Sequence, residues 1–262
     1  MVGMLSVVFP AVDDHLARDV LAAIGARPEH DVEAVVRAFR AWMPAGSTAK
    51  RLAVDAGRVP PGADPAEPLE ARLAGSLESW SCWVFCTTVG ALLAGRGHDV
   101  NVVVEHHRTA PVVDFHSVLI VDGSLLDPYL GPSAPVPPGH DVTRRDAWVS
   151  WVPADAPGGR WDHLGLRGGG SPYRYRVLGE RLDRHDVAAF CEISATHSGV
   201  GRRRGTHWFA GDRLWFVREG DDGTAELRVA EGLTPFEQRR RVVARGPYEE
   251  LRAHIDAPVV AP

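Results

Sequence analysis

Residues 79–94 read SWSCWVFCTTVGALLA, and this stretch decides the fold that we expect for the chain. Apolar side chains dominate it and Gly95 follows it, so we predict a buried α-helix over this range. Cys82 falls in the first turn of that helix, with Ser79 or Ser81 as its capping residue. Because the unpaired N–H groups and the dipole at a helix start favour an anion, they lower the pKa of a thiol placed there.

The three cysteines of the chain, Cys82, Cys86 and Cys191, call for different interpretations. Cysteine is a common small core residue, and we expect Cys86, one turn further into the helix, and Cys191 to serve only in packing. Cys82 by itself fits packing and chemistry equally well. An odd number of cysteines with no framework spacing predicts free thiols and a cytoplasmic protein.

A β-hairpin is predicted downstream of the helix. Val113–Val121 reads as a strand, Asp122-Gly123 is a hairpin signal, and Ser124–Asp127 resumes the ladder until Pro128 stops it. Another strand, Val100–Glu105, precedes this hairpin. A helix followed by antiparallel strands is typical of the α+β class.

The register of this hairpin brings His116 close to Asp127. With the turn centred between Asp122 and Gly123, Asp127 lies opposite Val118 and His116 is its diagonal neighbour on the same face. Cys82, His116 and Asp127 then form a possible triad, in which the histidine takes the thiol proton and the aspartate fixes the imidazole tautomer. A satisfied core histidine is the alternative for His116 alone, but the three residues in this order favour catalysis.

The segments that carry these residues resemble the arylamine N-acetyltransferases, members of the wider transglutaminase-like cysteine fold. Cys82-Trp83 resembles the aromatic-flanked cysteine that begins a helix in that family. His116-Ser117-Val118-Leu119-Ile120-Val121 resembles its histidine strand, "His-x-Val-Leu-Leu-Val". Asp127-Pro128-Tyr129-Leu130-Gly131 resembles the segment that the family opens with its aspartate, "Asp-Val-Gly-Phe-Gly". Glu78-Ser79-Trp80 stands where the family has Arg-Gly-Gly.

The resemblance implies three regions. Residues 1–96 would form an N-terminal helical bundle that carries the nucleophile, 97–180 a central antiparallel β-barrel with the histidine and aspartate, and 181–262 a C-terminal α/β lid. In the lid, Trp208–Val217 reads as a hairpin and Thr234 with Glu237 as the capping box of a last helix, Pro235 to about Ala244.

The resemblance also implies a function: ping-pong transfer of an acyl group from a thioester, through Cys82, to a small-molecule amine. The donor would be an acyl-CoA co-substrate, with acetyl-CoA as the first choice, or an acyl group on a carrier protein, and no permanently bound cofactor is expected. We expect Trp83, Tyr129, Leu130 and Gly131 to bind substrate. Two alternatives stay open: a transglutaminase-like peptidase or amide synthase with the same triad, and a binding protein that retains the triad as a relic.

Charge and composition argue against a nucleic-acid-binding or membrane-spanning protein. Lysine and arginine number 29 against 34 acidic residues, a formal net charge of −5, so no nucleic-acid partner is expected. No apolar run is long enough for a membrane span, and residues 1–10 are a poor signal peptide.

Three short motifs remain, and we predict no metal site. His106-His107 has no partner at ligand spacing, which predicts a solvated strand end. Gly168-Gly169-Gly170 lacks the strand and helix that flank a phosphate loop. Arg202, Arg203 and Arg204 fit either a coenzyme A phosphate site or a solvated loop.

Overall fold

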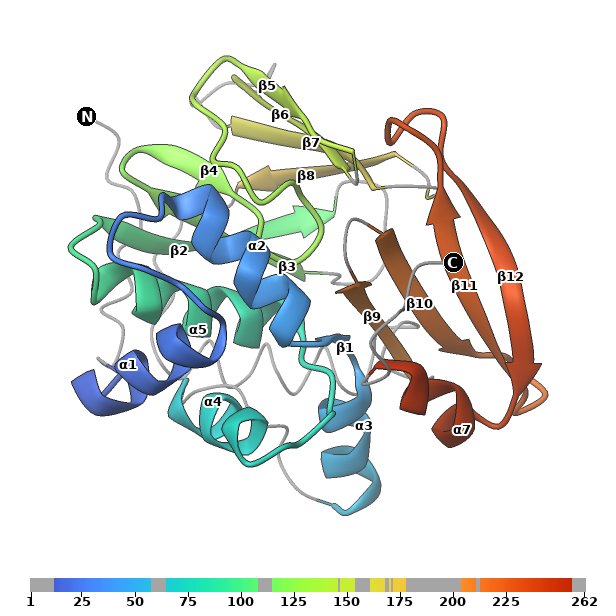
Figure 1. Ribbon diagram of the computed structural model, residues 1–262. Helices are drawn as coiled ribbons and strands as arrows, with labels where there is room; N and C mark the ends of the chain where they lie inside the picture. The colour runs from blue at the N-terminus through green and yellow to red at the C-terminus, as the bar shows by residue number, and fades with distance from the viewer. Residues whose placement is uncertain are drawn as a thin grey trace.

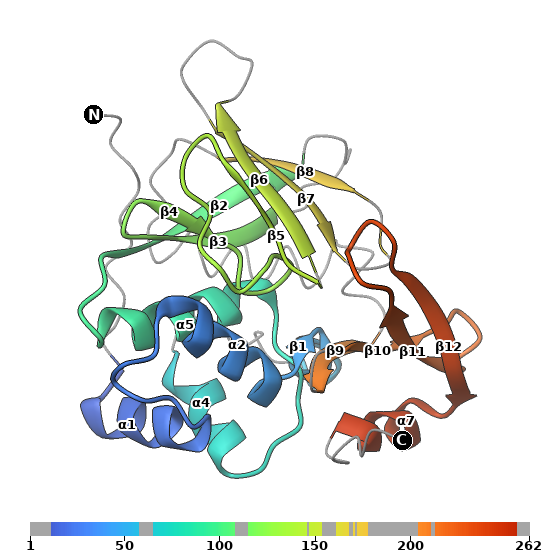
Figure 2. The ribbon, with the colours of Figure 1, turned by 45° about the horizontal axis from the view of Figure 1, so that its top comes forward.

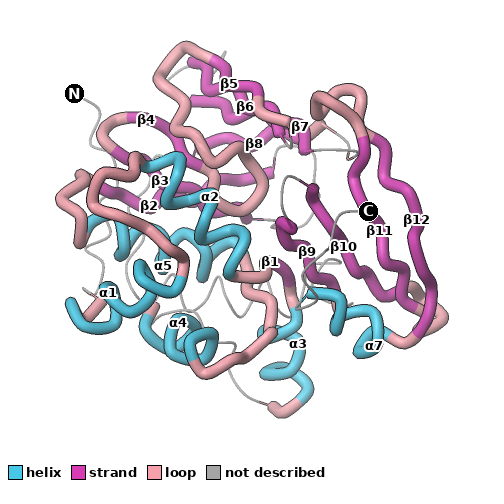
Figure 3. Tube along the Cα trace, viewed as in Figure 1, coloured by secondary structure: helices cyan, strands magenta, loops and turns pink. Residues whose placement is uncertain are grey.

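The computed structural model describes residues 12–57, 65–107, 115–145, 147–153, 161–167, 170, 172–177, 204–210 and 213–255. Within them, two antiparallel sheets and a group of helices pack together, with the helices below one sheet and the other sheet at the side (Figures 1 and 3). The mixed α and β composition expected from the sequence is confirmed.

The helical part contains α1 (Asp14–Ala23), α2 (Val32–Trp42), α3 (Thr48–Asp55), α4 (Ala66–Leu73) and α5 (Cys82–Ala94). The first two are capped at their N-termini, because the Asp13 and Asp31 carboxylates accept hydrogen bonds from first-turn N–H groups. Helix α5 is buried from Trp83 to Leu93, which explains why it is apolar on all sides. It packs on the first sheet with α2 and α4 around it (Figure 2).

The first sheet has seven strands in the order β4-β3-β2-β8-β7-β6-β5. Their bounds are β2 (Val100–His107), β3 (Phe115–Val121), β4 (Ser124–Leu126), β5 (Asp141–Thr143), β6 (Ala147–Pro153), β7 (Trp161–Arg167) and β8 (Tyr173–Val177). The predicted hairpin is present: Val121 pairs with Ser124 and Leu119 with Leu126, and Asp122 and Gly123 adopt positive φ angles.

The β-barrel expected for residues 97–180 is not found, since the described strands form an open sheet. Strands β4 and β5 are its two edges, and between them only an isolated bridge joins Leu125 to Val136. The connecting segment, 127–140, contains five prolines, which cannot donate ladder hydrogen bonds. This composition prevents a continuous strand from closing the sheet.

The second sheet has five strands in the order β1-β9-β10-β11-β12. They are β1 (Ala45–Gly46), β9 (Gly205–Ala210), β10 (Arg213–Glu219), β11 (Ala225–Glu231) and β12 (Arg239–Gly246), and helix α7 (Tyr248–Arg252) covers one end. Strand β1 comes from the N-terminal part of the chain, so this sheet mixes segments from the first and third predicted regions. The predicted region boundaries remain predictions.

The last predicted helix is wrong, because residues 239–246 form strand β12. They pair with β11 from Arg239↔Glu231 to Gly246↔Ala225. The capping box makes only a turn, in which the N–H groups of Glu237 and Gln238 donate to the Thr234 carbonyl. Val242 and Val243 favour a strand once β11 offers an edge. Asp186–Phe190, where the sequence favours a short helical turn, lies outside the described residues.

Among the described residues, no helix is long and apolar enough to cross a membrane.

We predict that Gly46→Ala destabilises the protein strongly. A Cβ at Gly46 would lie 2.0 Å from the Gly205 carbonyl oxygen and 2.6 Å from the Ser79 hydroxyl, so the β1–β9 pair would have to separate. Thermal unfolding should show a loss of at least about 1–3 kcal/mol, the cost of overpacking a core. The matched control is Gly246→Ala, where nothing lies within 4 Å of the new methyl group. Equal melting temperatures for the two variants would contradict this account.

Candidate active site

Cys82 is the first residue of α5 and is a part-buried free thiol. Ser81 occupies the N-cap position with an extended backbone, but its side chain makes no capping hydrogen bond there. Of the two serines proposed as caps, Ser81 therefore occupies the N-cap position, but its hydroxyl does not cap the helix. The first N–H groups of a helix have no intrahelical partner, so this end of α5 is suited to stabilise negative charge beside Cys82.

His116 and Asp127 form a buried ion pair beneath that helix end. The His116 Nε2 lies 2.9 Å from the Asp127 Oδ2, and the two residues are 3% and 2% exposed. The β3–β4 register produces this contact, as the sequence predicts. Because Nε2 is engaged by the carboxylate, Nδ1 is the imidazole nitrogen left for Cys82, with which His116 also forms a hydrogen bond.

The loop after β4 holds the Asp127 carboxylate in place. The backbone N–H groups of Tyr129 and Leu130 donate to its Oδ1 at 3.0 and 2.8 Å, and Gly131 N–H donates to its carbonyl. A Cβ on Gly131 would lie 2.8 Å from the Asp127 Cβ, so glycine permits this tight turn. Tyr129, Leu130 and Gly131, three of the residues predicted to bind substrate, therefore hold Asp127 in position.

The pKa values of the three groups shift in the directions that an ion-paired triad requires. Burial raises the pKa of the Cys82 thiol, but the hydrogen bond and charge of His116 outweigh it and the net shift is downward. Burial lowers the pKa of His116, yet the charge and hydrogen bond of Asp127 raise it well above its ordinary value. The pKa of Asp127 falls because His116 and the Leu130 N–H overcome its burial. These shifts favour thiolate, imidazolium and carboxylate together.

Cys86 differs from Cys82 as the sequence predicts. It is fully buried and donates to the Ser117 carbonyl oxygen at 3.0 Å, one turn further along α5. It is a packing residue with a satisfied thiol. Cys191 lies outside the described residues.

Tyr129 lies between His116 and the second sheet. Its ring lies 6.2 Å from that of His116 and 5.0 Å from that of His207 on β9, and it packs edge-on against Phe85. It also borders a small cavity under the second sheet. Trp83 is buried in the main core, where it packs with the helices. Tyr129 is therefore the predicted substrate-binding residue that is best placed to contact a ligand.

A group of four buried hydroxyls, which no sequence pattern indicates, connects the segment just before Cys82 to the second sheet. The Thr206 hydroxyl lies 2.9 Å from the Ser79 hydroxyl and 2.6 Å from that of Tyr248, and Thr48 contacts all three. Ser79 precedes Cys82 by three residues, and Tyr248 begins α7. The residues come from four separate segments, so no local motif could reveal them.

The structure describes only part of the remaining short motifs. Arg204 pairs with Glu219 and Glu249 at 2.7 Å each, as a structural residue would, whereas Arg202 and Arg203 lie outside the described residues. No cluster of three or more metal-ligating side chains occurs in the described part of the chain.

The comparison with solved structures identifies the fold. No family model matches the sequence, and no curated protein matches it. Among solved structures, the Mycobacterium marinum arylamine N-acetyltransferase in complex with CoA superposes with a TM-score of 0.67 at 17% identity, covering 92% of this chain and 98% of that one.

Two further structures give the same result. The M. smegmatis arylamine N-acetyltransferase has a TM-score of 0.63 at 22% identity, with 88% and 87% of the two chains covered. A Bacillus cereus arylamine N-acetyltransferase, described as having a Cys-His-Glu triad, has a TM-score of 0.62 at 13% identity over 89% and 94%. The protein therefore has an arylamine N-acetyltransferase-like fold, as the sequence resemblance predicted.

We predict that iodoacetamide alkylates Cys82 selectively, with a rate that persists below the pH at which an ordinary thiol ionises. The pKa of Cys82 is lowered by His116, so thiolate is lost only as the pH falls through that lowered value. In His116→Ala the midpoint of the rate–pH profile should move upward. Peptide mapping and rates at several pH values test this, with buried Cys86 as the internal control. Faster labelling of Cys86, or an unchanged midpoint in His116→Ala, would refute it.

Proposed function

We propose that the protein is a cysteine acyltransferase that moves an acyl group from a thioester donor to an amine, with Cys82, His116 and Asp127 as the catalytic triad. The observation that carries the proposal is the buried His116–Asp127 pair beside a thiol at a helix start. The fold shared with arylamine N-acetyltransferases supports the choice of acyl transfer over other cysteine chemistry.

The proposed first half-reaction acylates Cys82. The thiolate attacks the thioester carbonyl carbon, and the negative charge on its oxygen is stabilised by the N–H of Cys82 at the start of α5. Collapse of this intermediate breaks the carbon–sulfur bond of the donor. The departing thiolate takes the proton from the His116 imidazolium, which leaves an acyl-Cys82 and a neutral imidazole.

The second half-reaction transfers the acyl group to the amine. His116 accepts a proton from the attacking nitrogen, and the Cys82 thiolate leaves as the amide forms. Asp127 remains ionised throughout, because its role is to orient the ring and stabilise the imidazolium. The pair of nitrogens on one imidazole thus serves both steps, with Nε2 bound to Asp127 and Nδ1 carrying the proton.

The donor in this proposal is an acyl-CoA, with acetyl-CoA as the first choice, since a structural neighbour is described in complex with CoA. Tyr129 would border the acceptor, Trp83 the acyl group, and Leu130 and Gly131 the floor of the site. The replacement of Arg-Gly-Gly by Glu78-Ser79-Trp80 favours a second candidate, an amide synthase or peptidase that acts on a carrier-bound or peptide acyl group. A cytoplasmic location fits either chemistry.

Intact-mass analysis tests the proposal directly. Incubation with a panel of acyl-CoA esters should add one acyl mass to Cys82, and a small amine should then remove it. Acylation by a carrier-bound thioester or a peptide ester, with none by acyl-CoA, would favour the second candidate. No covalent adduct with any donor would exclude both.

We expect Cys82→Ala to remove essentially all turnover while the fold stays intact, because the thiol is small and part-buried. Cys86→Ala should retain most activity and lose some stability, since it removes a buried group and its contact with Ser117. Steady-state acyl transfer and thermal unfolding of the two variants test this contrast. Comparable activity of Cys82→Ala and the wild type would be incompatible with the proposal.

Asp127→Asn should slow acylation of Cys82 by roughly 10²–10⁴-fold, the range seen for orienting carboxylates in other triads. The amide nitrogen would donate where the carboxylate accepts, so His116 would turn its protonated nitrogen toward Cys82. Single-turnover acylation isolates the affected step, and donor binding should change little. If the variant acylates at the wild-type rate, Asp127 has only a structural role and the site is a Cys–His pair.

A further inference from the structure

A second histidine reaches the buried carboxylate of the triad. His163 lies on β7 and is 0% exposed, and its Nε2 is 3.9 Å from the Asp127 Oδ2. This is the same oxygen that the His116 Nε2 approaches at 2.9 Å from β3. The two ring centroids are 6.2 Å apart. The proposed acyl-transfer steps use His116 alone, so they do not account for a second imidazole at this place.

The other sides of the Asp127 carboxylate are already hydrogen-bonded. Its Oδ1 accepts from the N–H groups of Tyr129 and Leu130 at 3.0 and 2.8 Å, and its Oδ2 pairs with His116. An ionised carboxylate has about four lone-pair sites, so these three partners leave roughly one site, on Oδ2. His163 Nε2 is within ion-pair distance of that oxygen.

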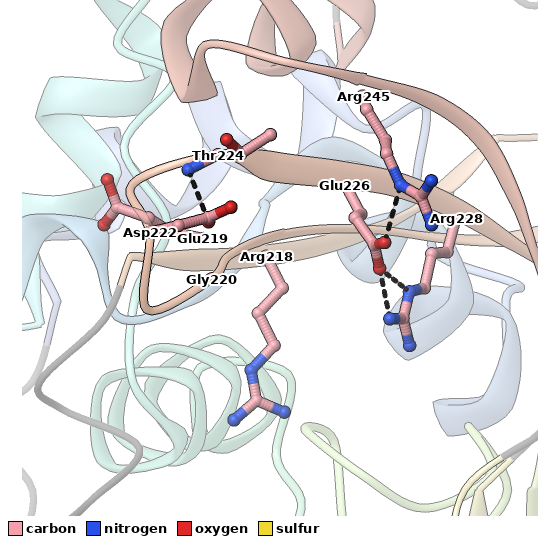
Figure 4. A pocket seen from close by; sticks show the side chains of 8 residues that line it. All are labelled: Arg218, Glu219, Gly220, Asp222, Thr224, Glu226, Arg228 and Arg245. Carbon is pink, nitrogen blue, oxygen red and sulfur yellow. Dashed lines mark hydrogen bonds and ion pairs between the residues drawn. The ribbon is translucent and has the colours of Figure 1, made fainter.

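Burial distinguishes Asp127 from a surface carboxylate that also has two basic partners. On the second sheet, the Nε atoms of Arg228 and Arg245 donate to Glu226 at 2.8 and 2.9 Å, beside a hollow in the surface (Figure 4). All three of those side chains are partly exposed, and ion pairs in contact with water contribute little. Solvent screens a buried pair much less, so a second basic side chain has a larger effect at Asp127.

Tyrosine rings from β8 fix the orientation of His163. Tyr175 is its direct cross-strand neighbour, and the Tyr175 ring lies 6.1 Å from that of His163 and stacks 4.9 Å from that of His116. Tyr173 meets the His163 ring edge-on at 5.4 Å. One aromatic ring therefore contacts both imidazoles, and a second ring supports His163 from another side.

Gly165 makes room for this support. It lies opposite Tyr173 in the β7–β8 pair, and a Cβ at Gly165 would be 2.1 Å from the Tyr173 Cζ and 2.2 Å from its hydroxyl oxygen. The tyrosine ring thus occupies the space in which a side chain at this position would lie. A glycine in the middle of β7 therefore permits Tyr173 to pack against His163, two residues away on the same strand.

We propose that His163 is a positioning residue of the triad, whose Nε2 proton points at the Asp127 carboxylate and keeps Oδ2 directed at His116. It touches no reacting atom and acts through Asp127 and His116. Without it, Oδ2 would lose one of its two imidazole partners, the carboxylate would turn more freely, and His116 would hold the Cys82 thiolate less firmly. The inference rests on the triad of the proposed function.

The first test is the rate–pH profile for alkylation of Cys82 by iodoacetamide, in the wild type, His163→Leu and His163→Gln. In His163→Leu the midpoint should move upward, because a less firmly held Asp127 stabilises the His116 imidazolium less, and the thiolate with it. His163→Gln keeps an N–H donor and should restore most of the difference. With a thioester that acylates Cys82, single-turnover acylation in His163→Leu should be slower by roughly 10–100-fold, the size of effect expected from misplaced catalytic groups.

Val136→Ala is the packing control, because Val136 is buried in a core cluster of the same sheet. It should lower the melting temperature and leave the midpoint unchanged. Three results would overturn the proposal: an unchanged midpoint in His163→Leu, equal shifts in the leucine and glutamine variants, or an equal shift in Val136→Ala. A wild-type midpoint at the value of an ordinary thiol would instead refute the triad, and this inference with it. A low wild-type midpoint that no His163 variant moves refutes this inference alone.

Nitrogen NMR of the imidazole rings gives a test that needs no His163 variant to fold. In the wild type the His163 Nε2 should carry a proton, and its resonance should shift in Asp127→Asn. Exposed His140 is the internal control, and its resonances should stay the same in both proteins. An unprotonated Nε2 on His163, or a resonance that does not respond to Asp127→Asn, would contradict the proposed contact.

Discussion

Burial of the Asp127 carboxylate is the constraint on which the site depends. An ionised carboxylate removed from water is unfavourable unless it is paired and hydrogen-bonded, and Asp127 is 2% exposed. His116 and the N–H groups of Tyr129 and Leu130 supply those partners. The hairpin register and the tight turn at Gly131 bring these partners to the one charge, and the charge in turn orients the His116 ring.

The same pairing sets the pH range over which Asp127 and His116 stabilise the folded protein. The pKa of Asp127 is lowered, so its stabilising contribution is present above the ordinary value of about 3.9 and is lost as the pH falls through the lowered one. The pKa of His116 is raised, so its contribution is complete below about 6.5 and disappears as the pH rises through the raised value. Mildly acidic to neutral conditions keep the whole ion pair.

A second constraint joins the nucleophile to distant parts of the chain. Ser79 lies just before α5, and its hydroxyl meets Thr48, Thr206 and Tyr248 at the junction with the second sheet. Because Gly46 pairs with Thr206 in the same place, strand β1 and the hydroxyls together connect the second sheet to the segment that leads into Cys82. This explains how His207, on the second sheet, comes to lie against Tyr129, in the loop after β4.

The sequence by itself determined the local features. The apolar run after Cys82, the Asp122-Gly123 turn and the spacing of His116 and Asp127 predicted the helix, the hairpin and the buried pair, because these depend on neighbours along the chain. Only tertiary structure decided that residues 239–246 form a strand, since β11 supplies the edge with which they pair. It also decided the open sheet, the cluster of four hydroxyls that includes Ser79, and the small cavity beside Tyr129. Those features join segments that are far apart in sequence, and their energies come from contacts that no local pattern encodes.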